Sequence, residues 1–466
     1  MVKKYGVWLL IFLFGSIYSL FSVLRHLRLE SFLFDLGYYD QIVWLSSNFK
    51  TLFSSISDMP VWADHFNPTL LLLTPLYWLW DNVIVLLIFQ AFFAALGAYP
   101  IFRIAQRRTK DLGLSLLASF LYLGFFGLQN AIAFDFHPIV LATTLLAFLF
   151  WFYEEKSFKA FGLTFVLFVG LQENFFLLGS ALGLFLIFQY RDIQRGLTIF
   201  VGSLLVYVFI IRLVIPFFGQ ASYLYLPSHL NNLSFPEIIK MLFYPFIKVK
   251  LVAVSLLAFG FFPIFSPSVL VLLLEEFGQR FLGTSIPSRW DLGYHYNIIL
   301  APALALGVVF TLKEYFLKRK ALAYIFLITG FILTQIITVP GTSRLLDKNF
   351  FDLSHVKDSK AVLSLIPKDA SVAATNNLGA QLTHRQKIIF LTNCQEDSTV
   401  WYQDMKRCYG LKPDYLVADL NPDSNPNNFY PDNSRESIER YFTFVQQKGE
   451  YQLLRKQGDV YLLKRK

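Results

Sequence analysis

The stretch "YGVWLLIFLFGSIYSLFSVL" (residues 5–24) contains no charged residue. About 20 apolar residues in an α-helix are enough to cross the roughly 30 Å of hydrocarbon in a bilayer. The stretch therefore predicts a first membrane span, which we expect the mature protein to retain. A different kind of sequence follows it, "FDLGYYDQIVW" (34–44), where two carboxylates stand among aromatic side chains.

The composition of the whole chain places it among polytopic membrane proteins. Of its 466 residues 55% are hydrophobic and only 16% are charged, and the mean hydropathy is +0.49. Hydropathy predicts about eleven spans, near 5–24, 82–105, 112–129, 138–153, 160–172, 174–189, 196–216, 251–263, 266–280, 295–312 and 321–340. The segments within 160–189 and 251–280 are short, so they could be broken or re-entrant helices.

Basic clusters indicate how the spans are oriented. Lys3 and Lys4 and the segments 103–110, 154–159, 190–195 and 313–320 fall on one side, which the positive-inside rule makes the cytoplasm. The outer loops are then 25–81, 130–137, 217–250 and 281–294. We expect a plasma-membrane protein with a cytoplasmic N-terminus. The net charge of +9 belongs largely to these clusters and does not indicate nucleic-acid binding.

The character of the sequence changes after Pro340. Residues 341–466 are polar and carry strand-like runs at 371–375, 387–391 and 414–420, followed by a hairpin pattern over 451–466. Residues 355–366 have helical spacing and end before Pro367. We therefore expect two domains, a membrane domain over 1–340 and a small extracytoplasmic α/β domain over 341–466.

Ionisable and polar residues gather at the outward ends of the predicted spans, where charged groups are costly and are usually placed for a reason. They lie in four separate loops: Asp35, Asp40, Asp64, His65, Asp135, His137, Glu173, Arg289, Asp291, His295 and Tyr296. Such a set, at one depth near the outer interface, favours a cavity that opens outward.

Each of these residues also has an ordinary structural interpretation. Asp35 and Asp135 could cap helices, Asp64 and His65 could be solvated loop residues, and Arg289 could pair with Asp291 across a turn. Glu173 is harder to explain in this way because it stands between two apolar runs. The chain has no HExxH or CxxC metal motif. The histidines could still bind a divalent cation together with the carboxylates, and the sequence leaves the cofactor open.

Several stretches resemble a prokaryotic family of predicted membrane proteins, domain of unknown function 2079. They are "FDLGYYDQIVW" (34–44), "HFNPTLLLLTPLYWL" (65–79), "AFDFHPIVLATTLLAFLFW" (133–151), "LQENFFLLGSALGL" (171–184), "YHYNIILAPALALG" (294–307) and "LSLIPKDASVAATNNLGAQLTHR" (363–385). The resemblance covers nearly the whole chain. The family is in turn similar in layout to the GT-C class of integral membrane glycosyltransferases.

The GT-C resemblance implies an activity. Such enzymes transfer a sugar from a polyprenyl-phosphate carrier to a glycan, lipid or protein acceptor on the outer face, and their first outer loop carries an essential Asp or an acidic pair. Asp35 and Asp40 occupy the matching region as catalytic candidates, although four residues separate them. A carboxylate can act as general base toward the acceptor hydroxyl.

The resemblance also suggests roles for the remaining candidates. Arg289 can grip the donor phosphate with its planar guanidinium. The other substrate-binding candidates are Asp64, His65, Asp135, His137, Glu173, His295 and Tyr296.

Two other functions remain open. A transporter or flippase of a lipid-linked substrate would place its site at the midplane between broken helices, often with inverted repeats, and the sequence shows no such repeat. A non-enzymatic envelope protein would use the outer domain to bind a partner. It would keep its biological function when Asp35 and Asp40 are both replaced by Asn.

Cys394 and Cys408 are the only cysteines of the chain. Both fall in the domain that we expect outside the cytoplasm, where oxidising conditions permit a disulfide. The bond would close a loop of roughly 15 residues, for which loop-closure entropy gives about 3 kcal/mol of stabilisation. Two unpaired buried thiols are the alternative.

Overall fold

The structure is a computed structural model, and it describes residues 2–219, 223, 225, 233–283, 286–391, 412–423, 425–429 and 434–466. The chain forms two compact units. Unit 1 contains residues 1–22, 62–72 and 87–344, and unit 2 contains residues 23–61, 73–86 and 345–466. Most of the first outer loop therefore belongs to the same unit as the C-terminal α/β fold.

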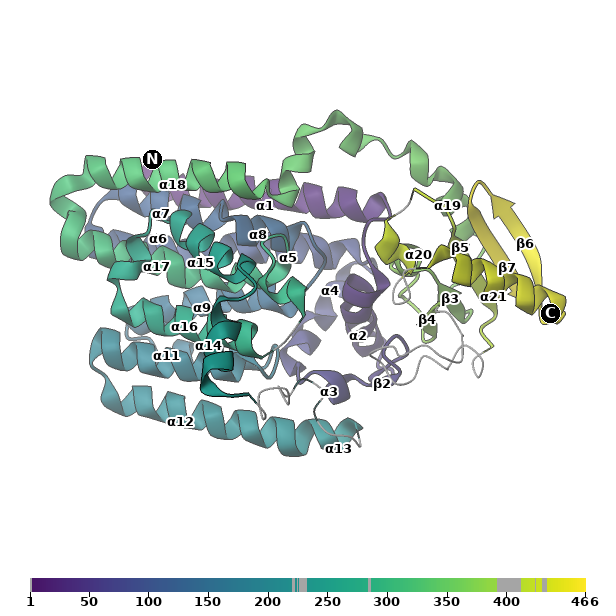
Figure 1. Cartoon of the computed structure of the whole chain (residues 1–466), viewed down its shortest axis with the longest axis horizontal. Coiled ribbons are helices and arrows are strands. Elements are labelled where there is room, and N and C mark those ends of the chain that lie inside the picture. The colour runs from purple at the N-terminus through teal and green to yellow at the C-terminus, as the bar shows by residue number, and fades with distance from the viewer. Residues whose placement is uncertain are drawn as a thin grey trace. The chain divides into compact units, whose positions relative to one another are not determined.

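Unit 1 is helical (Figure 1). It begins with most of α1 (Val2–Leu27) and continues with α3 (Val61–Asp64), α5 (Ile84–Leu96), α6 (Ala98–Thr109), α7 (Leu112–Leu123), α8 (Phe126–Ile132), α9 (Pro138–Glu154), α10 (Phe158–Val169), α11 (Phe175–Tyr190), α12 (Ile193–Phe209), α13 (Ile215–Gly219), α14 (Phe235–Phe243), α15 (Ile247–Leu257), α16 (Pro267–Leu282), α17 (Leu300–Thr311) and α18 (Lys320–Thr338).

Helix α17 forms the centre of unit 1. All of its residues are buried, and it packs against α6, α7, α9 and α16. A helix that is apolar on every side has to be enclosed by its neighbours, as α17 is. By contrast, α12 and α18 expose large apolar side chains such as Leu205, Phe209 and Ile336, as helices that face lipid do.

Within the described residues, four helical segments are long and apolar enough to cross a membrane, judged by length and composition: Tyr5–Leu27, Ile84–Thr109, Ile193–Gly219 and Pro287–Thr338. The bent pair α7 and α8 would make a fifth. Pro287–Thr338 has 52 residues, more than twice the length that one crossing requires. The predicted number of eleven spans stays a prediction.

Unit 2 contains a five-stranded sheet of order β4-β3-β5-β7-β6. Strands β3 (Val372–Ala374), β4 (Ile388–Phe390) and β5 (Tyr415–Asp419) are parallel, and the hairpin β6 (Tyr451–Gln457) and β7 (Val460–Arg465) joins β5 antiparallel. These strands confirm the runs expected from sequence, and α19 (Lys357–Leu363) confirms the helical pattern there. The sequence analysis did not anticipate α21 (Arg435–Gln447).

The sheet has a core on each face because successive strand residues point to opposite sides. Val372, Val417 and Leu462 pack on one face against α19 and against Leu33 of the first outer loop. Leu416 and Leu463 pack on the other face against α21. Part of the segment 23–61 thus lies in the hydrophobic core of the α/β fold and carries Asp35 and Asp40 with it, whereas Asp64 and His65 belong to unit 1.

The other elements of unit 2 are short. They are a π-helical turn (Leu33–Gly37), α2 (Tyr38–Ser47), β1 (Phe53–Ser54), β2 (Met59–Pro60), α4 (Thr74–Leu79) and α20 (Asn376–Gly379). The π-helical turn leads directly into α2, so Asp35 and Asp40 lie on one nearly continuous helical segment.

Cys394 and Cys408 lie outside the described residues, and the disulfide stays a prediction. We expect purified, unreduced protein to resist alkylation at both cysteines and to react fully after reduction, because a disulfide leaves no free thiol. Labelling of both thiols without reductant would contradict the bond, and it would also weaken the extracytoplasmic placement of this domain.

Candidate functional site

Asp40 is the centre of a buried polar cluster in unit 2. Its carboxylate is 0% exposed. It accepts hydrogen bonds from the hydroxyls of Tyr77 and Thr383, and its Oδ1 lies 3.2 Å from Nε2 of His384. Three donors on one buried carboxylate satisfy most of its hydrogen-bonding capacity, as a buried charge requires.

His384 is held on both ring nitrogens. Its Nδ1 lies 2.8 Å from Oδ1 of Asp81, a carboxylate whose side chain is 63% exposed. The ring stacks on Trp44 at 5.9 Å and meets the edge of Tyr77 at 5.0 Å. The imidazole therefore lies between a buried and an exposed carboxylate, with 23% of its own side chain open to solvent.

The cluster shifts the pKa values of both its acid and its base in the direction that favours the charged forms. Burial by itself would raise the pKa of Asp40, but the charge of His384 and the bonds from His384, Thr383 and Tyr77 lower that pKa below its ordinary value. Burial would lower the pKa of His384, but Asp40 and Asp81 outweigh it and raise that pKa. Each of the two groups therefore favours the charged form of the other.

Asp35 lies in a different environment from Asp40. It is half-buried in the π-helical turn, and the N-cap positions of this turn and of α2 are Phe32 and Gly37, so Asp35 is not the N-cap residue of either. The backbone N–H of Phe34, next to it, donates to Oδ1 of Asn376 at 3.0 Å. Of the two catalytic candidates, Asp35 is the one with a partly accessible side chain.

A second polar cluster in unit 1 brings together three predicted residues, Asp64, His65 and Glu173. Glu173 lies in the turn between α10 and α11 and is 0% exposed. Its carboxylate lies 2.8 Å from Nδ1 of His65 and accepts from the backbone N–H of Phe66 at 2.9 Å and from the hydroxyl of Tyr223 at 2.6 Å. The interpretation of Glu173 as a solvated loop residue is therefore wrong.

Two tyrosines complete this cluster. The hydroxyl of Tyr225 donates to Asp64 at 2.8 Å, and its ring stacks on His65 at 4.7 Å. Burial by itself would lower the pKa of His65, but the charges of Glu173 and Asp64 raise it to about 9. Burial would raise the pKa of Glu173, but the charge of His65 and its hydrogen bonds lower it. His65 is therefore cationic at neutral pH.

Glu173→Gln should remove a pH-dependent part of the stability. The pKa of His65 rises from about 6.5 in an unfolded chain to about 9, so the stabilisation is complete below about pH 6.5 and is lost as the pH rises through about 9. We expect the melting temperature of the wild type to approach that of Glu173→Gln over this interval. Melting curves of detergent-purified protein from pH 6 to 10 measure it.

Glu237→Gln is the matched control for this experiment. Glu237 is an exposed carboxylate of unit 1 whose side chain accepts from Ser234 at the start of α14, and Gln can accept in its place. The difference in melting temperature between Glu237→Gln and the wild type should not change over the same pH range. Parallel curves for wild type and Glu173→Gln would contradict the assignment of a charged His65–Glu173 pair.

The loop 133–137 between α8 and α9 brings His137 close to His295. Their rings stack at 3.8 Å, and the ring of Tyr296 lies 4.0 Å from that of His295. Asp135 is buried, and the N-cap of α9 is His137, so Asp135 does not cap that helix. The backbone N–H of His137 donates to Gln90 of α5 at 2.9 Å, which fixes the loop.

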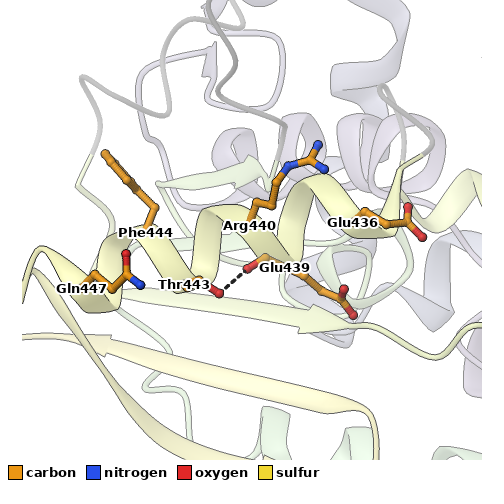
Figure 2. A pocket seen from close by; sticks show the side chains of 6 residues that line it. All are labelled: Glu436, Glu439, Arg440, Thr443, Phe444 and Gln447. Carbon is orange, nitrogen blue, oxygen red and sulfur yellow. Dashed lines mark hydrogen bonds between the residues drawn. The ribbon is translucent and has the colours of Figure 1, made fainter.

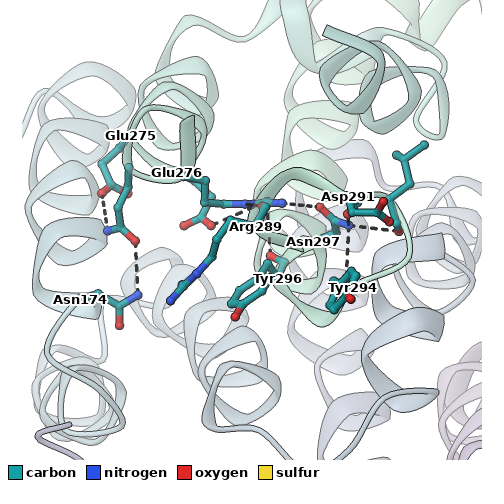
Figure 3. Close-up of polar contacts among 11 residues, drawn as sticks. Asn174, Glu275, Glu276, Arg289, Asp291, Tyr294, Tyr296 and Asn297 are labelled. Atoms are coloured by element: carbon teal, nitrogen blue, oxygen red, sulfur yellow. Dashed lines mark hydrogen bonds and ion pairs between the residues drawn. The ribbon is translucent and has the colours of Figure 1, made fainter. Parts of the chain in front are cut away.

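Arg289 lies beside Tyr296 of the same cluster (Figure 3). Its guanidinium covers the ring of Tyr296 at 4.4 Å, and within the described residues it makes no ion pair. The expected alternative, a pair with Asp291, is not formed, because Asp291 accepts instead from the backbone N–H of Gly293 at 2.7 Å. The charge of Arg289 lowers the pKa of His65, but the larger effects of Glu173 and Asp64 outweigh it.

Arg280, which the sequence analysis did not single out, supports the backbone around Arg289. Its guanidinium donates to the backbone oxygen of Arg289 at 2.7 Å and to Oδ1 of Asn297 at 2.6 Å, and it lies 3.9 Å from Glu276. Asn297 in turn donates to the backbone oxygens of Asp291 and Tyr294 (Figure 3). This network sets the position of the loop that carries Arg289.

The sequence analysis also missed residues of the clusters themselves. They are Tyr77, Asp81, Thr383 and His384 around Asp40, and Tyr223 and Tyr225 around Glu173. His384 lies in the stretch 363–385 that carried the family resemblance, and this was the only signal that could have found it. Among the described residues, no group of three or more His, Cys, Asp or Glu side chains could hold a metal ion.

A shallow depression of about 340 Å³ lies on α21 (Figure 2). Its lining residues, which include Glu436, Arg440 and Phe444, all come from that one helix. None of the predicted site residues lines it, and it takes no part in the site considered below.

Comparison with known proteins gives a family and a fold. The sequence model of a family described as "Predicted membrane protein (DUF2079)" matches residues 25–462. Two crystal structures of ArnT from Cupriavidus metallidurans are similar to this structure. The form bound to undecaprenyl phosphate has a TM-score of 0.53 at 9% identity and covers 98% of both chains. The apo form has a TM-score of 0.56 at 10% identity and covers 99% of this chain and 98% of that one. A search of curated protein sequences gave no match.

Proposed function

Because this chain belongs to the family of predicted membrane proteins known as DUF2079 and has a fold similar to that of ArnT, a GT-C glycosyltransferase, we propose that it is an integral membrane glycosyltransferase. In this proposal it transfers a sugar from a polyprenyl-phosphate donor to a glycan, lipid or protein acceptor on the outer face of the cell membrane. One of the similar ArnT structures holds undecaprenyl phosphate, which supports a donor of this kind.

The observation that carries the proposal is the guanidinium of Arg289 in unit 1. Arg289 makes no ion pair with any described residue, and its guanidinium, stacked on Tyr296, keeps its hydrogen-bond donors for another partner. A planar guanidinium suits a phosphate, which it can bind through two parallel hydrogen bonds.

The chemistry assigns different roles to the two aspartates. The acceptor hydroxyl loses its proton to Asp35 as its oxygen attacks the anomeric carbon, and the bond from that carbon to the phosphate oxygen breaks with its electrons on the phosphate. Asp35 is partly accessible and fits this role. Asp40 is enclosed and carries three donors, so we give it the role of holding the segment in place.

The proposal includes a topology. Residues 1–340 form the membrane domain with a cytoplasmic N-terminus, and residues 341–466 lie outside the cytoplasm, as the basic clusters suggest. Asp64, Asp135, His137, Glu173, His295 and Tyr296 would shape the substrate-binding region in unit 1. The need for a divalent cation stays open in this proposal.

Arg289→Lys should weaken the use of the donor. Lysine keeps the charge but loses the bidentate fork, and a lost hydrogen bond to a charged group costs about 1.5–3 kcal/mol. We expect the apparent KM for the donor to rise about 10- to 150-fold. Arg319→Lys, which changes an exposed arginine in the same way, should leave it unchanged. An unaltered dependence on donor concentration in Arg289→Lys would rule out a phosphate contact.

Mass spectrometry of surface glycans and lipid-linked sugars, in cells with and without the protein, tests the function. A transferase should add a sugar to a surface glycan, lipid or protein, and its loss should remove that sugar while the polyprenyl-phosphate form accumulates. Unchanged profiles of both would contradict the proposal. Accumulation of the lipid-linked sugar on the cytoplasmic side alone would favour the flippase.

A further inference from the structure

His384 contacts parts of unit 2 that are far apart in the sequence. It belongs to the turn after α20, and its ring meets Asp40 and Trp44 of α2, Tyr77 of α4 and Asp81, which follows α4. The neighbouring residues reinforce this contact. The Thr383 hydroxyl donates to Asp40, and the backbone oxygen of Arg385 accepts from Gln41 at 3.2 Å.

The turn that carries Asp35 is held by the same part of the α/β fold. Asn376 of α20 accepts from the backbone N–H of Phe34 at 3.0 Å. Leu33 is 0% exposed within the core of the sheet, and Gly37 approaches Thr383 so closely that an added Cβ would lie 2.9 Å from its methyl group. The segment 33–40 is therefore fixed at its start by Asn376 and at its end by Thr383 and His384.

Other polar groups face this cluster. Asp40, Asp81 and Tyr77 face His384 directly, and His26 of α1 is close enough to Asp40 to respond to its charge. The two carboxylates and one imidazolium leave a net charge of about −1. If His384 lost its proton, two carboxylates would lie beside a neutral ring. Because Asp40 is buried, no solvent could then stabilise its negative charge.

We propose that His384 is a positioning residue of the transferase site, whose imidazolium, held between Asp40 and Asp81, fixes the segment 33–47 and through it the carboxylate of Asp35. The inference rests on the proposed function for its catalytic consequence. The mechanical part, that protonated His384 holds 33–47 in place, stands on the contacts alone. That part can be tested without a substrate.

The expected pH dependence follows from the two carboxylates. They raise the pKa of His384, so its contribution is complete below the ordinary histidine value of about 6.5 and is lost as the pH rises through the raised value. The segment 33–47 should therefore be well protected at pH 6 and less protected in alkaline solution. Asp81→Asn removes one carboxylate and should move this loss of protection to lower pH.

Hydrogen exchange of the full-length protein in lipid nanodiscs measures the mechanical part. After correction for the intrinsic rate at each pH, we expect His384→Gln to speed exchange in 33–47 by about 10-fold or more at pH 6, since local opening becomes easier. The control is His355→Gln, an exposed histidine of the same unit, which should not change exchange. Equal protection of 33–47 in wild type and His384→Gln would overturn the proposal.

Transfer activity measures the catalytic part. His384→Gln should lower it on the order of 10²-fold, because a small displacement of a catalytic group costs that much. Asp81→Asn, which leaves the buried Asp40–His384 contact intact, should shift the alkaline limb of the pH profile to lower pH. Full activity of His384→Gln despite a loosened 33–47 would overturn the positioning role. A wild type without any transfer activity would instead disprove the proposed function, while the exchange result would still decide the mechanical part.

Discussion

Replacing Asp35 by Asn is expected to lower sugar transfer by 10²- to 10⁴-fold, which is the usual contribution of a general base. The substitution keeps the size of the side chain and one acceptor oxygen, and it removes the basic carboxylate. Asp35 is half-buried in a turn that Asn376 and the sheet core hold in place. We therefore expect normal expression and folding with nearly complete loss of activity.

The readout for Asp35→Asn is the surface glycan restored in cells that lack the protein, quantified by mass spectrometry. Asp423→Asn serves as control because Asp423 is an exposed carboxylate of the same unit. It should restore the glycan fully. If Asp35→Asn also restores it at the wild-type rate, Asp35 is not the base.

Removing the Asp40 carboxylate should have the largest effect on stability. Asp40→Ala removes the buried carboxylate that pairs with His384, which keeps only Asp81, and it frees the hydroxyls of Tyr77 and Thr383. Breaking a buried ion pair by removing one partner costs about 3–5 kcal/mol. This loss of free energy is a large share of the stability of a domain. We therefore expect a melting temperature that is many degrees lower, or a poor recovery of folded protein.

A double-mutant cycle separates the pair from its surroundings. The double variant Asp40→Ala/His384→Ala should lose less than the sum of the two single variants, because the second change removes a group that was already unpaired. Glu450→Ala breaks the exposed pair with Lys412 at 3.4 Å and should cost less than about 1 kcal/mol. Additive losses at Asp40 and His384 would show that the two groups do not support each other.

Periodicity and hydropathy were sufficient to predict much of the fold. The strand-like run of 414–420 predicted β5, and the apolar run over 295–312 predicted the helix α17, because these patterns depend only on local hydropathy. The number of spans was harder to predict, since α7 and α8 are bent and Pro287–Thr338 contains more than one helix. Helix α21 was missed although its apolar face packs on the sheet.

The partners of the candidate residues could not be predicted from local pattern. Asp40 meets Thr383 across a separation of 343 residues, and His65 meets Glu173 across 108. Contacts over such distances depend on how the elements pack. The position of Glu173 in the sequence was informative, because a carboxylate between two apolar runs needs a buried partner that compensates its charge. His384, which pairs with Asp40, lies in a turn whose local sequence gave no indication of a site.

The central claim is that the protein breaks the bond between a sugar and a polyprenyl phosphate. The direct measurement uses the purified protein in vesicles. The vesicles contain the lipid-linked sugars and the acceptor-bearing membranes of cells that lack this protein. Mass spectrometry quantifies the polyprenyl phosphate that is released. We predict that the wild type releases polyprenyl phosphate as the sugar appears on the acceptor, and that Asp35→Asn releases almost none. Transfer of the intact lipid-linked sugar between leaflets without any release of polyprenyl phosphate would contradict the account.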